Sequence, residues 1–284
     1  MSEEHWDSVI KPAGKWYGLD LKSVWKYRDL LMLLVRRDFV SVYKQTILGP
    51  VWFFIQPILT TITLTIVGGI AGISTEGIPR ILFYLSGITL WSYFAECLNK
   101  TSNTFTANAS VFGKVYFPRL VVPLSILISN LVRFGVTLLL FFTVWLYYLL
   151  RTDTVHPQWS HIWFLPVLVL MMAGLGLGFG ILISSLTTKY RDFTFLVSFG
   201  VQLMMYASPI IYPVSLVSAK IPKYKMLLLA NPVSSVIEAF KYIFLGSGYF
   251  NLYALLYSFG FMLILLLLSI IVFNKVERNF MDTV

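Results

Sequence analysis

Long stretches without a charged residue constrain the fold of this chain more than any other feature. Residues 162–188 and 193–219 each run for 27 positions without Asp, Glu, Lys or Arg, and residues 242–274 run for 33. A helix needs roughly 20 apolar residues to cross about 30 Å of hydrocarbon. Because lipid satisfies no backbone hydrogen bonds, such segments must be helical or part of a closed barrel. The pattern predicts an all-α integral membrane protein.

Composition agrees with this prediction. Charged residues make up 12% and apolar residues 57% of the 284 positions, against about 25% and 45–50% in soluble proteins. The net charge of +9 does not indicate nucleic-acid binding, because most basic residues flank the apolar stretches, where membrane proteins carry them. The single Cys97 excludes an internal disulfide. The first 50 residues lack the apolar segment of a signal peptide, so we expect none there.

Six membrane-spanning helices account for the uncharged windows. The predicted spans are 51–73, 81–98, 120–150, 162–187, 193–212 and 251–273. The longest window is divided by Gly246-Ser247-Gly248. We expect a cytoplasmic N-terminal region over 1–50, a transmembrane domain over 51–274 and a short tail over 275–284.

The segment 213–250 does not look like an ordinary loop. Pro213, Pro222 and Pro232 interrupt it, and a short apolar helix follows, for which Asn231 and Ser234 are candidate caps and Gly246 is a stop signal. The segment is too apolar for an exposed loop and its helix is too short to span. It predicts short re-entrant helices on the outer face, between spans five and six.

Orientation follows from Lys and Arg. If the N-terminus is cytoplasmic, the segments 1–50, 99–119, 188–192 and 274–284 hold 15 of the 22 basic residues, and the opposite face holds 6. Cytoplasmic loops carry the excess of basic residues in most membrane proteins. Both termini are therefore predicted to be cytoplasmic.

An amphipathic helix is predicted over 23–43. Val24, Tyr27, Leu31, Leu34, Val35 and Val42 share a stripe at helical spacing. Such a helix rests in the membrane interface with its basic residues toward the headgroups, or packs on a partner domain. Gly49-Pro50 should end the surface segment and start the first span, because Pro fits the first turn of a helix.

Catalytic and nucleotide-binding motifs are absent from the sequence. His5, His156 and His161 lie outside the spans, and no metal-spaced Cys/His group or G-x-x-x-x-G-K-[ST] loop occurs. We expect no catalytic residue, no metal and no cofactor in this chain. If ATP drives the protein, a separate polypeptide must bind the ATP and Mg²⁺.

Two ionisable residues lie inside predicted spans. Glu96 and Arg133 fall toward the cytoplasmic half of adjacent spans, so they can pair. Charge in hydrocarbon is costly and usually pairs or faces a cavity. We favour a structural ion pair over a substrate contact. In span four, Gly174/Gly178 and Gly176/Gly180 give two G-x-x-x-G patterns, which favour close helix packing within or between subunits.

Aromatic residues make up 17% of the chain, and several lie in or beside spans one, two and five. An interfacial aromatic belt explains most of them. The alternative is a channel that carries sugars, because an aromatic ring offers an apolar face and a polar edge. The candidates for that channel are Trp52, Phe53, Tyr84, Trp91, Tyr93, Phe94, Tyr206 and Tyr212.

Several segments together resemble the transmembrane permease subunit of polysaccharide ABC exporters. The resemblance rests on Tyr43-Lys44-Gln45-Thr46-Ile47-Leu48-Gly49-Pro50 with Gln56-Pro57, on Lys114-Val115-Tyr116-Phe117-Pro118-Arg119, on Tyr190-Arg191-Asp192, and on Asn231-Pro232 through Glu238-Ala239-Phe240 to Leu245-Gly246. It covers nearly the whole chain from Leu19 onward.

This resemblance implies a homodimer with two separate ATP-binding subunits in the bacterial inner membrane. It implies that spans one and five line the channel, which favours Trp52, Phe53, Tyr206 and Tyr212. The helix 23–43 would act as a gate for lipid-linked polymer; its candidate residues are Trp25, Tyr27, Arg36, Arg37, Tyr43 and Lys44. The segment that couples to the ATPase would contain Lys114, Tyr116, Phe117, Pro118 and Arg119.

The expected function is export of undecaprenyl-diphosphate-linked polysaccharide, with O-antigen the favoured polymer. A same-fold exporter of teichoic acid, small lipids or drugs is the alternative. A membrane glycosyl- or acyltransferase is disfavoured, because it needs a polar cluster at one face and the sequence shows none.

Overall fold

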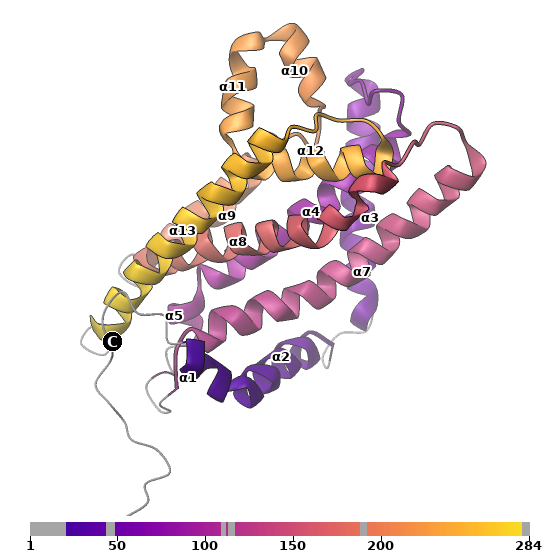
Figure 1. Ribbon diagram of the computed structural model, residues 1–284. Helices are drawn as coiled ribbons and strands as arrows, with labels where there is room; N and C mark the ends of the chain where they lie inside the picture. The colour runs from indigo at the N-terminus through magenta and orange to yellow at the C-terminus, as the bar shows by residue number, and fades with distance from the viewer. Residues whose placement is uncertain (1–20, 44–48, 109–111, 113–116, 188–191, 280–284) are drawn as a thin grey trace, which may run out of the picture.

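The computed structural model describes residues 21–43, 49–108, 112, 117–187 and 192–279. Within these ranges all regular structure is helical (Figure 1). The helices are α1 Leu21–Lys26, α2 Arg28–Tyr43, α3 Trp52–Ile70, α4 Arg80–Thr101, α5 Thr104–Ala107, α7 Val121–Arg151, α8 Leu165–Thr187, α9 Phe193–Tyr206, α10 Val214–Lys220, α11 Pro222–Ala230, α12 Pro232–Leu245 and α13 Leu252–Asn279, with 3-10 turns η1 Gly49–Val51 and η2 Trp159–Phe164.

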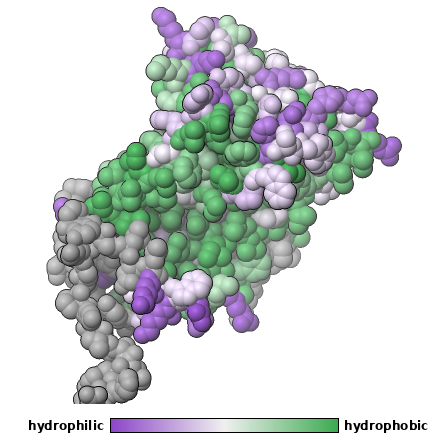
Figure 2. All heavy atoms as spheres, viewed as in Figure 1, coloured by the Kyte–Doolittle hydropathy of each residue, from purple (hydrophilic) through white to green (hydrophobic). Residues whose placement is uncertain are grey.

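Five helical stretches in the described residues are long and apolar enough to cross a membrane: α3, α4, α7, η2 with α8, and α13. They match five of the six predicted spans. Figure 2 shows the corresponding belt of hydrophobic residues between two more polar ends of the molecule. The α10–α11 hairpin stands at one of these ends, and α1 and α2 lie at the other (Figure 1).

The remaining predicted span, span five at 193–212, is shorter in the structure. Helix α9 has 14 residues, about 21 Å at 1.5 Å per residue. It ends at Tyr206, three residues before Pro209, which has no N–H for a helical bond. Helices α11 and α12 also form an apolar pair bent by 97°, which fits a broken span or a re-entrant segment. The count of six spans therefore stays a prediction.

Helix α8 lies at the centre of the bundle and packs closely on two neighbours. Gly176 and Gly180 face α4: a Cβ added at Gly176 would lie 2.8 Å from Cys97 Cβ. Gly174 and Gly178 face α13, where a Cβ at Gly178 would lie 2.8 Å from Leu265 Cγ. Each predicted G-x-x-x-G pair thus packs against a different neighbouring helix. The packing role within the subunit is confirmed.

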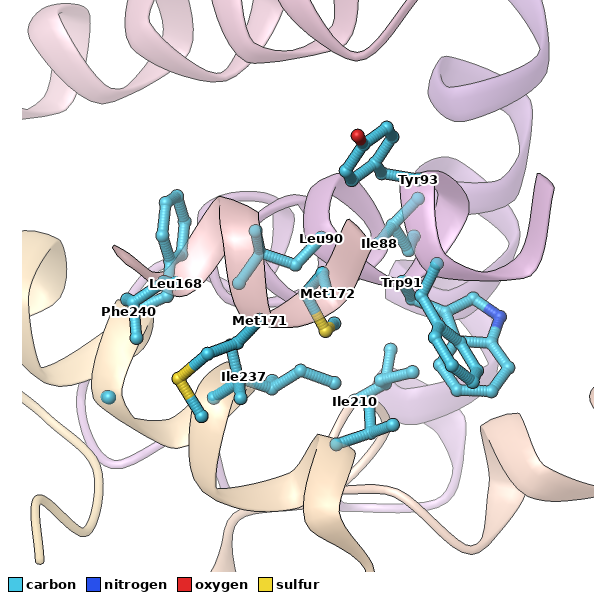
Figure 3. Close-up of a cluster of buried hydrophobic side chains, with 14 of the residues drawn as sticks. Ile88, Leu90, Trp91, Tyr93, Leu168, Met171, Met172, Ile210, Ile237 and Phe240 are labelled. Carbon is cyan, nitrogen blue, oxygen red and sulfur yellow. The ribbon is translucent and has the colours of Figure 1, made fainter. Parts of the chain in front are cut away.

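The main hydrophobic core forms where α4, α8 and α12 meet. Figure 3 shows part of it, with Leu90 from α4, Met172 from α8 and Ile237 from α12. All three side chains are fully buried. Helix α7 also packs on α4 and contributes Phe134, Phe141 and Trp145 to this core, whereas α3 packs on α4 from outside it.

The first span begins where the Gly-Pro signal predicted. The turn η1 covers Gly49–Val51, and α3 starts at Trp52. Gly49 has a φ of +47°, a value that only glycine adopts readily. The break between surface helix and span is confirmed.

The predicted short helix after Asn231 is also present, as α12. The side chain of Asn231 accepts a hydrogen bond from the backbone N–H of Val233 at 3.0 Å, and Gly246 ends the helix at a φ of +74°. Asn231, and not Ser234, is the cap, because Ser234 is already inside the first turn. A 97° bend separates α12 from α11.

The N-terminal helix has a break that the periodicity did not predict: α1 and α2 are separated by a turn at Tyr27. Helix α2 packs along α7. Val24 and Leu34 are buried there in a second, smaller core with Val121 and Val122. The stripe predicted for the membrane interface therefore contacts protein along part of its length.

Candidate functional site

A cluster of polar side chains joins α4 and α7 within the membrane belt. Glu96 Oε2 lies 3.0 Å from Lys100 Nζ and 3.5 Å from Arg133 Nη1. Lys100 also donates to Asn130 Oδ1 at 3.1 Å. The guanidinium of Arg133 lies 5.0 Å from the ring centre of Phe53 on α3. The structure thus brings Glu96 and Arg133 together and extends the pair to a three-helix junction.

This geometry suits a structural role. The carboxylate has two cationic partners, and the guanidinium adds a cation–π contact, so neither charge faces hydrocarbon alone. Sequence reasoning missed Lys100 and Asn130, although Lys100 stands at the i,i+4 position from Glu96, a known spacing for helical ion pairs.

Four of the predicted channel aromatics are buried inside the subunit. Tyr84 and Phe94 are 0% exposed, Tyr93 is 3% and Trp91 is 6%. Tyr84 packs on Gly68 of α3, and Tyr93 packs on Phe134 with ring centroids 5.0 Å apart and ring planes tilted by 37°. These four aromatic rings pack against other side chains of the same subunit. Their burial does not support a role in lining a channel.

The candidates on spans one and five have different surroundings. Trp52 is 48% exposed and Tyr206 is 50% exposed. Phe53 is half-buried beneath Arg133, and the hydroxyl of Tyr212 donates to the Tyr206 carbonyl at 2.7 Å. Of the eight aromatics, Trp52 and Tyr206 therefore present the largest free surface.

An apolar cavity of about 590 Å³ opens beside Tyr212, between α9 and the α10–α11 hairpin. Its lining is Met204, Ala207, Tyr212, Val217, Tyr224, Leu227, Leu228, Ala230, Asn231 and Pro232. A cavity of this size and lining is typical of sites that hold small ligands or a segment of a larger one. The hairpin residues were not predicted, since their roles depend on how 213–232 folds back.

The proposed gate helix has apolar residues on its free side as well. Trp25, Met32 and Leu33 are 70%, 63% and 61% exposed, among exposed Arg36 and Arg37. Tyr27 is partly buried against the second core. Lys44 and the side chain of Tyr43 lie outside the described residues. Exposed apolar residues beside arginines fit a helix at a membrane surface.

The segment predicted to couple to an ATPase is held to the bundle by Phe117. Its side chain is 6% exposed and packs on Phe112, with ring centroids 5.7 Å apart. The guanidinium carbon of Arg119 lies 5.5 Å from the centroid of the Phe112 ring. Pro118 is half-buried. Lys114 and Tyr116 lie outside the described residues. Phe117 thus anchors this end of the segment to the bundle.

A buried ion pair in α12 was not recognised from the sequence. Lys241 is 0% and Glu238 is 2% exposed, with Nζ and Oε1 3.6 Å apart. The Lys241 ammonium lies 3.8 Å from the Phe83 ring centre and donates to the Pro209 carbonyl. Opposite charges at i,i+3 in an otherwise apolar helix were the available signal, but from the sequence Lys241 counts only among the six basic residues of the outer face.

Within the described residues, no group of three or more His, Cys, Asp or Glu side chains could hold a metal ion.

Comparison with known proteins gives one consistent result. The sequence signature of the ABC-2 type transporter family matches residues 29–245. Two O-antigen export system permease proteins RfbA of Klebsiella pneumoniae are 27% and 28% identical over 256 residues, which is 89% of this chain and 94% of each relative. The protein of that name from Myxococcus xanthus is 26% identical over 79% of this chain and 83% of its own length.

The resemblance drawn from the motifs is therefore confirmed at the level of the family. Together with the apolar helices, it makes the chain a multi-pass membrane protein and the transport subunit of an ABC system, which works with ATP-binding subunits. The matched region runs from α2 through α12 and so includes the charge cluster, the cavity and the buried pair. The chain belongs to the ABC-2 type transporter family.

Proposed function

We propose that this chain is the permease subunit of an exporter that moves undecaprenyl-diphosphate-linked polysaccharide, with O-antigen the favoured polymer, across the bacterial inner membrane. The observation that carries the proposal is the match to O-antigen export permeases over 89% of the chain. The exposed side chains of Trp52 and Tyr206, and the apolar cavity lined by Tyr212, are consistent with it. Both termini are cytoplasmic in this proposal.

The mechanism requires two copies of the chain and two separate ATPase subunits that bind ATP and Mg²⁺. Closure of the ATPases moves the segment around Phe117, which is packed on α2 and α7 residues through the second core. Movement of that core would displace α2 and α3 and open a channel along Trp52 and Tyr206. The polymer's reducing-end lipid would pass the arginines and exposed apolar residues of α2.

Substitutions in the coupling segment test the partner assignment. Lys114→Glu combined with Tyr116→Ala should reduce co-purification of the ATPase at least tenfold, because both residues belong to the proposed coupling segment and precede Phe117 by at most three positions. Lys223→Glu, at the opposite end of the molecule, is the matched control. Normal ATPase association of the double variant, and of a chain lacking residues 112–119, would contradict the coupling role.

Deletion of the chain tests the substrate. Lipid-linked glycan should accumulate in the cytoplasm and disappear from the cell surface. Trp52→Ala and Tyr206→Ala should restore less export than wild type while keeping the ATPase bound. Unchanged surface glycan in the deletion strain would instead favour export of a small lipid or drug, which the 590 Å³ apolar cavity could also accommodate.

A further inference from the structure

A second, polar pocket lies next to the α10–α11 hairpin. It has a volume of about 160 Å³ and is lined by Glu76, Val214, Ser215, Ser218, Lys225, Gly248 and Tyr249. At ~30 Å³ per water in the liquid, this is room for about five waters, the scale of one sugar ring. The hairpin separates it from the larger cavity, which is lined by Val217, Tyr224 and Leu227 from the same two helices.

The pocket offers hydrogen-bonding groups of both kinds. The Glu76 carboxylate accepts a hydrogen bond from the Ser215 hydroxyl, and Ser218 adds a second hydroxyl. Lys225 Nζ lies 5.1 Å from the ring centre of Tyr249, whose side chain remains 39% exposed. Carboxylates accept, ammonium groups donate and hydroxyls do both, so the lining can serve each hydroxyl of a polyol.

Its two charged residues have opposite signs. Glu76 and Lys225 leave the lining with no net charge, so neither an anion nor a cation gains overall attraction, and a neutral polar molecule suits the pocket. A partly exposed tyrosine ring provides an apolar surface for the C–H face of a sugar ring. A carboxylate, hydroxyls and an aromatic face within one small concavity therefore favour a neutral polyhydroxylated ring over a lipid tail or a free phosphate.

The buried pair of α12 holds one wall of this pocket in place. Glu238 Oε2 accepts a hydrogen bond from the backbone N–H of Tyr249 at 2.9 Å. Gly248, with a φ of +119°, lies so close that an added Cβ would be 3.2 Å from the Glu238 carbonyl oxygen. Buried charges are costly unless they are well paired; Lys241 pairs with Glu238, and the Glu238 carboxylate in turn holds the backbone that presents Tyr249.

We propose that this pocket is a sugar-binding subsite at the end of the protein opposite α1 and α2, where the polymer leaves. Glu76, Ser215, Ser218 and Tyr249 would contact one sugar ring, and Glu238 and Lys241 would act as positioning residues. The inference rests on the proposed function and extends it, since it gives the hairpin a contact with the polymer's neutral sugars.

Binding to the complete complex in nanodiscs tests the subsite. The probe is the set of oligosaccharides released from the producing cell's lipid-linked polymer, measured by equilibrium dialysis. Tyr249→Leu and Glu76→Gln should each weaken binding at least tenfold. Tyr253→Leu, at a tyrosine that is 84% exposed on α13, and Lys223→Ala are the matched controls and should bind like wild type.

Binding by both pocket variants within twofold of wild type would overturn the subsite. If Tyr249→Leu lowers the melting temperature, Ser218→Ala replaces it, because that substitution removes only one oxygen. Ser218→Ala should weaken oligosaccharide binding two- to fivefold, and unchanged binding would count against the proposal.

Vesicles of phosphatidylglycerol serve as a second probe. If these vesicles compete for the pocket and unlabelled oligosaccharide does not, the pocket binds a lipid headgroup and the sugar subsite is wrong. A deletion strain complemented with the wild-type chain separates the two proposals. If surface polymer is restored but both pocket variants bind oligosaccharide like wild type, only the subsite proposal is contradicted. If surface polymer is not restored, the proposed function itself is contradicted.

Discussion

Helices α3 and α4 follow one another in the chain and are similarly apolar, yet their surroundings are opposite. The mean hydropathy of their most apolar windows is 1.7 and 1.4, but 11% of the α3 window and 78% of the α4 window is buried. The less apolar helix is therefore the inner one. In a bilayer, lipid is as apolar as a protein core, so hydropathy alone does not tell which helix lies inside.

The residues that each helix buries explain the difference. Helix α3 buries only Pro57, Thr61 and Gly68, which form one narrow stripe, while Ile62 and Ile66 are exposed. Small residues let helices approach closely, and Gly68 receives the Tyr84 ring of α4. In α4 the hydroxyls of Ser86 and Thr89 bond to backbone carbonyls of their own helix at 2.7 Å, so they can be buried without loss.

The largest expected effect comes from truncating the same residue type in both helices. Phe94→Ala, in the core of α4, should lower the free energy of unfolding by about 3–5 kcal/mol, because it leaves a cavity. Phe54→Ala, at a position 36% exposed on α3, should cost about 0.5 kcal/mol or less. Denaturant unfolding in detergent measures both. Equal losses would show that α3 is as tightly packed as α4.

An added side chain tests the close approach of α8 to α4. Gly176→Val should destabilise the protein by about 1–3 kcal/mol through overpacking, since even a Cβ there would lie 3.0 Å from the Phe94 carbonyl oxygen. Gly200→Val on α9 is the matched control, because a Cβ there meets nothing within 4 Å. Thermal melting compares the two. A stable Gly176→Val protein would argue that the α4–α8 contact can separate.

The smallest effect concerns the link between the outer and inner helices. A double-mutant cycle with Arg133→Met and Phe53→Leu should give a coupling energy of about 0.5–1 kcal/mol from the cation–π contact. The same cycle with Phe54→Leu in place of Phe53→Leu should give none. A coupling near zero for Phe53 would mean that α3 is held at this level by lipid or by a second subunit.

Much of the fold could be predicted because charge and proline act locally. The uncharged windows located α3, α4, α7, α8 and α13, and Gly49-Pro50, Asn231 and Gly246 marked helix ends within a residue or two. Each of these signals depends on the residue's own backbone chemistry. The predicted range 193–212 extends six residues beyond the end of α9, because Pro209 cannot continue the helix while the segment stays apolar, and hydropathy does not register that break.

The site was predicted less well, because its residues come from distant segments. Periodicity could pair Glu96 with Arg133, but it could not show that Tyr84, Trp91, Tyr93 and Phe94 face inward, since aromatic residues suit both a core and a channel. Nor could it place Glu76 beside Ser215, 139 positions away. Nor could a count of basic residues on the outer face show that Lys241 is buried within α12.

The sequence by itself determined the class of protein, the family and the positions of most helices, since lipid permits only segments whose backbone groups bond within themselves. The tertiary structure alone decided which apolar helix is inside, which glycine meets which neighbour, and which polar residues share a pocket. Those outcomes depend on side-chain size and fit between helices. In a lipid environment that fit, and not hydropathy, distinguishes the core from the surface.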